Sequence, residues 1–317
     1  MKYRRFAKIL VLPVILLIFS GMYLSADLNV SQVWSAWARF DIYYLSLALL
    51  LAVLNILSLG SRLRFLSGGA VDYTNACIVS IVGASLNVLL PAKLGEVTKI
   101  ALLTQRCKLS LTRTSIIVFW ERFFDVNLLI LIALVATILG LPPAFGAAVF
   151  TFLLVLWLGL ILVKYWDYAT IILLKLVPAG RVETFFRDAV ENLRSSFNLR
   201  LLIGGFAYSL IPWGLFTLQI FVVLTLGSML ELTVGQKLLV FLTASLTTAV
   251  PLTPGAIGVY EAAVVAVLVQ FEIGKELALT TAIVMHSIQY LPALLGVAWA
   301  LVAFPGTLTS YKQKPSD

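Results

Sequence analysis

ASLTTAVPLTPGAIGVYE, at residues 244–261, interrupts an otherwise almost continuously apolar region with helix-breaking residues and a glutamate. Backbone groups freed by a helix break at membrane depth are tolerated only inside protein or beside a wet cavity. A carboxylate at that depth is costly, which makes Glu261 a candidate site residue. The alternative is a plain proline kink with Glu261 near the headgroups, but the P-x-x-P-G-x-x-G spacing favours a functional break. The residues predicted to form the break are Pro251, Pro254, Gly255 and Gly258.

A second segment, ASLNVLLPAKLG at residues 84–95, matches the first when Pro91 is aligned with Pro251, a shift of 160 positions. Short apolar segments interrupted by Pro and Gly in corresponding halves are the best sequence indication of a transporter's binding site. Chance similarity between apolar segments is the alternative, and the aligned helix breakers argue against it. We expect Gly258 to let the second hairpin pack closely on its counterpart. The identities are Ala84, Ser85, Leu86, Pro91 and Gly95 with Ala244, Ser245, Leu246, Pro251 and Gly255.

Three motifs together resemble the lysylphosphatidylglycerol synthase transmembrane family, whose members are described as flippase-like. They are PAKLGEVTKIALL at 91–103, ERFFD at 121–125 and PLTPGAIGVYE at 251–261. The resemblance covers nearly the whole chain and implies a polytopic, lipid-handling domain with re-entrant helices. The chain differs from the full synthases in having no soluble C-terminal aminoacyl-transfer domain, so we do not expect it to aminoacylate lipids.

The composition indicates an integral membrane protein. Of 317 residues, 61% are hydrophobic and 12% are charged, whereas about 25% of a soluble domain is charged. We therefore predict an all-α, polytopic membrane bundle that forms a single transmembrane domain over residues 1–317. The net charge of +8 does not indicate a nucleic-acid partner, because the basic residues cluster at helix ends. Cys77 and Cys107 fit no metal spacing, and we expect no metal site, cofactor or disulfide.

About six segments are long and apolar enough to span a bilayer. The first could be a signal peptide, but its length favours an uncleaved helix. Between the spans we predict two re-entrant hairpins, at 72–104 and 237–271, within repeat halves at 72–139 and 201–304. Residues 178–200 form a predicted amphipathic cytoplasmic segment that lies on the headgroups or caps the bundle, with Glu183 and Arg187 as an i,i+4 pair. The predicted spans are 6–24, 42–60, 116–139, 145–163, 201–226 and 277–304.

The distribution of Lys and Arg predicts the orientation. With the N-terminus in the cytoplasm, most basic residues fall on the inner side, and only Arg39, Lys237 and Lys275 fall outside. This places both termini in the cytoplasm of a bacterial cell, with the chain as a multi-pass protein of the inner (plasma) membrane. The two hairpins then enter the membrane from opposite faces, an arrangement that alternating access uses.

Two charged groups are the candidate headgroup-binding residues. Lys93, Glu96 and Lys99 are three residues apart and share one helix face, where they could also be snorkelling lysines with a surface partner. Glu121, Arg122 and Asp125 begin a span, where they could be a solvated helix end, pair with the lysines or contact the ligand directly. The family resemblance, through Gly95-Glu96 and E-R-x-x-D, favours a pocket. His286 is conceivable as a proton relay, although a hydrogen-bonded core histidine is the simpler interpretation.

We expect a lipid transporter that moves an anionic phospholipid, or a polyprenyl-phosphate-linked lipid, across the bilayer. The alternatives are an intramembrane lipid-modifying enzyme with Glu261, Glu96 or Asp125 as general base, and a membrane partner subunit of a lipid or glycan synthase. No second-substrate site is visible, so we do not expect an enzyme. The sequence is compatible with both a monomer and a homo-oligomer.

Overall fold

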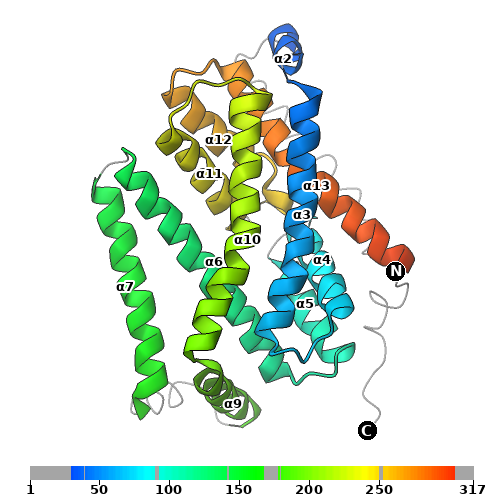
Figure 1. The fold of residues 1–317 in the computed structure, drawn as a ribbon, viewed down its shortest axis with the longest axis vertical. Coiled ribbons are helices and arrows are strands. Elements are labelled where there is room, and N and C mark those ends of the chain that lie inside the picture. Colours follow the sequence, from blue (N-terminus) through cyan, green and yellow to red (C-terminus); the bar gives the residue numbers. More distant parts are fainter. Residues whose placement is uncertain are drawn as a thin grey trace.

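The computed structural model describes residues 30–38, 40–89, 93–140, 143–167, 178, 180–249 and 253–303. These residues form helices and connecting loops without a strand, which confirms the all-α class for this part of the chain (Figure 1). The α-helices are α2 (Val30–Trp37), α3 (Ile42–Leu66), α4 (Tyr73–Leu89), α5 (Leu94–Gln105), α6 (Leu111–Ile138), α7 (Pro143–Tyr165), α9 (Arg181–Ser196), α10 (Leu199–Val222), α11 (Val234–Ala249), α12 (Val259–Gln270) and α13 (Lys275–Ala303).

Among the described residues, 4 helices are long and apolar enough to cross a membrane. They correspond to the predicted spans 42–60, 145–163, 201–226 and 277–304. The predicted first span, 6–24, lies outside the described residues. The predicted span 116–139 falls within α6, which is long enough but is not among the 4, because it carries Glu121, Arg122 and Asp125 in addition to Arg113. The spans are Ile42–Leu66, Gly146–Tyr165, Leu199–Gly227 and Lys275–Trp299.

The same order of helices occurs twice. In the first set, the long helix α3 is followed by the short helices α4 and α5 and the long helix α6. In the second set, α10 extends through a π-helical turn, η1 (Val223–Gly227), and is followed by the short helices α11 and α12 and the long helix α13. The helices α5 and α12 both have 12 residues. Each set is thus two long helices enclosing a broken pair of short ones.

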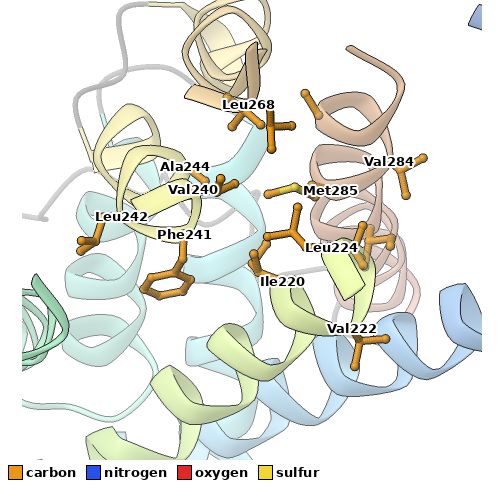
Figure 2. Packing of buried hydrophobic residues seen from close by; sticks show 14 of the residues in the cluster. Ile220, Val222, Leu224, Val240, Phe241, Leu242, Ala244, Leu268, Val284 and Met285 are labelled. Atoms are coloured by element: carbon orange, nitrogen blue, oxygen red, sulfur yellow. The ribbon is translucent and has the colours of Figure 1, made fainter. Parts of the chain in front are cut away.

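Two hydrophobic cores match the two sets. One core joins α3, α4, α5 and the first half of α6, and it includes Leu63, Val79, Leu103 and Phe124. The other core joins the end of α10 with α11, α12 and α13; Figure 2 shows Ile220 and Leu224 facing Phe241, Leu268 and Met285. The long helices connect the two cores, since α3 packs along α10.

The helix breaks have unusual backbone conformations. Pro91 and Pro251 lie outside the described residues, whereas Pro254 begins a 3-10 turn, η2 (Pro254–Ala256). Gly255 has a φ of 62° and Gly258 has a φ of 82°, and residues other than glycine rarely adopt such backbone angles. Gly255 also makes the close approach between hairpins, because a Cβ there would lie 2.8 Å from the carbonyl oxygen of Val88. Gly255 is therefore required both for its small size and for its backbone conformation, and Gly258 is required at least for its backbone conformation.

The polar segment between the sets is helical, as predicted. The helix α9 lies across one end of the bundle beside the start of α10 (Figure 1) and packs on α6 and α7. The predicted i,i+4 pair forms, with Arg187 Nη2 lying 2.8 Å from Glu183 Oε1. At the same end, Asp72 precedes α4 and accepts hydrogen bonds from the Asn75 backbone and side chain, which hold the pKa of the Asp72 carboxyl below its ordinary value.

Candidate functional site

A cavity of about 520 Å³ is lined by residues from both broken helix pairs. The long helices α3, α6, α10 and α13 supply the rest of its wall. A ligand in this cavity would therefore contact both sets of helices at once. The polar and charged residues of the lining are Asn55, Arg62, Asn87, Lys93, Glu96, Lys99, Arg122, Asp125, Ser245, Thr248, His286 and Gln289.

Lys93 connects the two broken pairs. It precedes α5 with a φ of 54° and makes no N-cap hydrogen bond. Its ammonium donates a hydrogen bond of 2.6 Å to the carbonyl oxygen of Thr248, in the last turn of α11. A cation at a helix C-terminus is favourable, because the terminal carbonyl groups have no partner within the helix. Lys93 therefore holds the end of α11 against the start of α5 while it lines the cavity.

A buried ion-pair network lies beside the cavity. Lys99 Nζ is 2.7 Å from Glu121 Oε2, and Arg62 Nη2 is 3.7 Å from Glu121 Oε1. Lys99 is 4% exposed, Arg62 3% and Glu121 0%. Two cations and one carboxylate have thus been removed from water, so each depends on the others for compensation. The snorkelling interpretation of Lys99 is excluded by this burial.

Asp125 joins that network to the cavity surface. It accepts hydrogen bonds from Arg62 Nη1 at 2.5 Å and from Trp213 Nε1 at 2.8 Å. Arg122 Nη2 lies 3.0 Å from the other oxygen of Asp125, and Arg122 Nη1 lies 3.4 Å from Glu96 Oε1. Glu96 therefore forms its ion pair with Arg122 and not with Lys93 or Lys99.

Glu261 and His286 form a second buried pair, between α12 and α13. One oxygen of Glu261 accepts a hydrogen bond of 2.7 Å from the Gly258 backbone N–H. The other oxygen lies 2.7 Å from His286 Nδ1. The His286 ring stacks on Tyr260 with ring centroids 4.1 Å apart. Glu261 thus fixes the start of α12 and orients the histidine that lines the cavity.

The cavity lining favours an anion. It contains the four cations Arg62, Lys93, Lys99 and Arg122 against the two carboxylates Glu96 and Asp125. The Nε atoms of both arginines are buried without a hydrogen-bond partner, and so is Asn87 Oδ1. Buried polar atoms nearly always have a partner, so unpartnered atoms on residues that line a cavity indicate a missing ligand or water. Two arginines with free donors match a phosphate or carboxylate group.

The predicted site residues separate into two groups. Lys93, Glu96, Lys99, Arg122 and Asp125 line the cavity. Gly95, Glu121 and Glu261 lie behind its lining. A Cβ on Gly95 would lie 2.0 Å from the Gly83 carbonyl oxygen, so Gly95 lets α5 pack directly on α4.

Among the cavity residues that were not predicted as site residues, three contact its carboxylates or the buried Glu261. Arg62 was assigned to the inner side of the membrane, because the predicted span ends at residue 60, whereas α3 continues to Leu66. Trp213 follows the proline inside α10, and no charge pattern marks it. His286 was interpreted as a core histidine. The available signal for its role was Glu261, an acid one turn after the glycine break that needs a polar partner when it is buried.

We expect Glu261→Gln to insert into the membrane but to lose most of its activity. Glutamine keeps the size of the side chain, yet it has a single acceptor oxygen, which cannot accept from Gly258 N–H while the other end of the side chain also accepts from His286 Nδ1. Membrane abundance and transport should be measured together. Glu231→Gln, at an exposed residue before α11, is the matched control. Full activity of Glu261→Gln would remove the evidence that this pair supports the site.

Comparison with known families identifies the chain. The sequence profile described as "Lysylphosphatidylglycerol synthase TM region" matches residues 5–296. No curated protein sequence matches the chain significantly. The chain belongs to the lysylphosphatidylglycerol synthase transmembrane family, as its motifs predicted, and it is a membrane protein. Among the described residues, no group of three His, Cys, Asp or Glu side chains is placed to hold a metal ion.

Proposed function

We propose that this member of the family carries an anionic phospholipid, or another lipid-linked phosphate, across the bilayer. The observation that carries the proposal is the central cavity, whose lining has an excess of cations and comes from both broken helix pairs. A phosphate group would pair with Lys93 and the free donors of Arg62 and Arg122. The apolar lining residues, among them Val126, Leu129 and Phe216, would accommodate the first part of the lipid tails.

The packing pattern supports an inverted repeat. Helix α4 packs on α13, and its counterpart α11 packs on α6; α3 packs on α13, and its counterpart α10 packs on α6. The first short helix of each broken pair therefore contacts the last long helix of the other set. Two sets related by a pseudo-two-fold axis would produce this reciprocal pattern. With about six spans and re-entrant pairs at α4–α5 and α11–α12, the two sets could expose the cavity to opposite faces in turn.

The direct test is reconstitution in liposomes that carry a labelled anionic phospholipid in one leaflet. We expect the protein to accelerate the loss of leaflet asymmetry well above the rate in protein-free liposomes. Labelled phosphatidylglycerol and a labelled polyprenyl phosphate should be compared with zwitterionic phosphatidylcholine. The absence of acceleration with every headgroup would contradict the proposal. An altered lipid inventory in a deletion strain would instead favour a lipid-modifying enzyme.

In the same assay, Lys93→Gln should slow transport of the anionic lipid about tenfold or more, because a charged hydrogen-bond donor in the cavity is lost. Lys108→Gln is the matched control, since Lys108 has the same charge and lies exposed in the loop after α5. Equal, small effects of the two substitutions would show that Lys93 has no role in binding.

The proposed orientation is tested by cysteine labelling. After Cys77 and Cys107 are replaced by alanine, single cysteines at Ser31 and Thr233 should react with an impermeant maleimide in intact cells. A cysteine at Ser195 should react only after lysis. All three positions are exposed, so a missing reaction cannot be attributed to burial in the fold. Labelling of the Ser195 variant in intact cells would reverse the orientation.

A further inference from the structure

A second cavity, of about 680 Å³, lies away from the central one. It is enclosed by the end of α3, the loop that leads to α4, the start of α4, and the junction between α9 and α10. It shares no lining residue with the central cavity. Its lining is Ser61, Arg64, Phe65, Leu66, Gly68, Gly69, Tyr73, Ser196, Asn198, Arg200, Leu201 and Tyr208.

The lining of this second cavity is cationic. It contains Arg64 and Arg200 and no carboxylate. Within the described part of the chain, neither guanidinium has a hydrogen-bond or ion-pair partner, whereas Arg62, two residues before Arg64, forms ion pairs with Glu121 and Asp125. Arg200 lies in the first turn of α10, where the free backbone N–H groups of the helix add to the positive potential.

The other wall of the second cavity is aromatic. The rings of Phe65 and Tyr208 stack with centroids 4.8 Å apart and an interplanar angle of 22°. A Cβ on Gly204 would lie 2.0 Å from the Phe65 ring, so glycine at this position lets the ring lie against α10. Two free arginines beside an apolar wall form an amphipathic pocket, which matches a charged headgroup attached to a hydrocarbon chain.

The position of the second cavity agrees with that ligand. It adjoins α9, an amphipathic helix whose apolar residues Val182 and Phe186 remain exposed, as in a helix that lies among lipid headgroups. It also lies at the end of α3, one of the helices long and apolar enough to span the membrane. Basic pockets between membrane-spanning helices on the cytoplasmic side bind anionic lipid headgroups.

We propose that this second cavity is a binding site for the phosphate of an anionic phospholipid, separate from the central cavity. Arg64 and Arg200 bind the phosphate oxygens, and the first methylene groups of an acyl chain lie along Phe65 and Tyr208. The site does not require that the protein transports lipid. It would hold a lipid at the surface of the bundle, whether as a structural lipid or as one waiting to enter.

Native mass spectrometry of the delipidated full chain, titrated with phosphatidylglycerol, tests the proposal. We expect Arg64→Gln/Arg200→Gln to lose one tightly bound lipid, or to bind it about tenfold or more weakly, because both charged donors are removed. Lys108→Gln/Arg181→Gln changes the net charge equally at two exposed residues outside the cavity and should bind as the wild type does. Lys93→Gln, in the central cavity, should retain this lipid, which distinguishes the two sites.

Three results would overturn the proposal. The first is equal lipid binding by the wild type and Arg64→Gln/Arg200→Gln, at unchanged melting temperature. The second is an equal loss in Lys108→Gln/Arg181→Gln, which would show a general charge effect. The third is displacement of the lipid by millimolar inorganic phosphate, since a lipid held also by its tail should resist the free ion; that result would assign the pocket to a soluble phosphate.

Discussion

Gly255→Val is expected to abolish lipid transport and to lower the melting temperature of the purified protein. A Cβ at this position would lie 1.5 Å from Tyr290 Oη and 2.8 Å from the Val88 carbonyl oxygen. The backbone φ of 62° is an additional obstacle for a β-branched residue. Overpacking costs about 1–3 kcal/mol, and the left-handed conformation adds about 1–2 kcal/mol. Relief of the clash would separate the two broken pairs, and the cavity depends on their contact.

The loss of transport and of thermal stability should be specific to substitutions at the place where the two hairpins meet. Gly214→Val in α10 is the matched control, because a Cβ there meets no atom within 4 Å. Gly214→Val should keep both melting temperature and transport near the wild-type values. Tyr290→Phe separates the two causes of the Gly255 effect, since it removes only the hydrogen bond from Tyr290 Oη to the Gly255 carbonyl oxygen. Wild-type transport by Gly255→Val would show that the tips of the hairpins need not touch.

The sequence predicted the helical class, the family and both helix breaks because these depend on local features. Apolar runs, paired prolines and glycines, and charges three or four residues apart are visible within one segment. The pairing of Lys99 with Glu121 was among the alternatives for the same reason, since both lie in predicted helices that follow one another. The ion-pair partner of each charged residue was harder to predict from the sequence. Glu96 pairs with Arg122 and not with the adjacent lysines, which depends on how α5 and α6 are rotated.

Contacts between distant segments could not be read from the sequence. The Lys93–Thr248 hydrogen bond joins residues 155 positions apart, and the Arg62–Asp125 pair depends on the extension of α3 beyond the predicted span. The close approach at Gly258 stays a prediction, and the structure shows a close approach at Gly255, which the sequence assigned only to the helix break. Both glycines occupy left-handed backbone conformations, and only the structure shows that Gly255 is also required for its small size.

The largest loss of stability is expected from Glu121→Gln. Glu121 is fully buried and compensates Lys99 directly and Arg62 at longer range. Its neutralisation leaves Lys99 as a buried cation without a counter-ion, and breaking a buried pair in this way costs about 3–5 kcal/mol. The abundance of the variant in membranes, and its melting temperature in detergent, should both fall. A melting temperature equal to that of the wild type would mean that water reaches Lys99.

Replacement of both partners separates stability from function. Lys99→Met/Glu121→Met removes the two charges together, and apolar replacements of a buried ion pair are often neutral or stabilising. We therefore expect the double variant to recover abundance and melting temperature. Transport of the anionic lipid should nevertheless stay below the wild-type rate, because Lys99 is one of the four cations that line the cavity. Full recovery of transport would make the Lys99–Glu121 pair purely structural and leave phosphate binding to Lys93 and the two arginines.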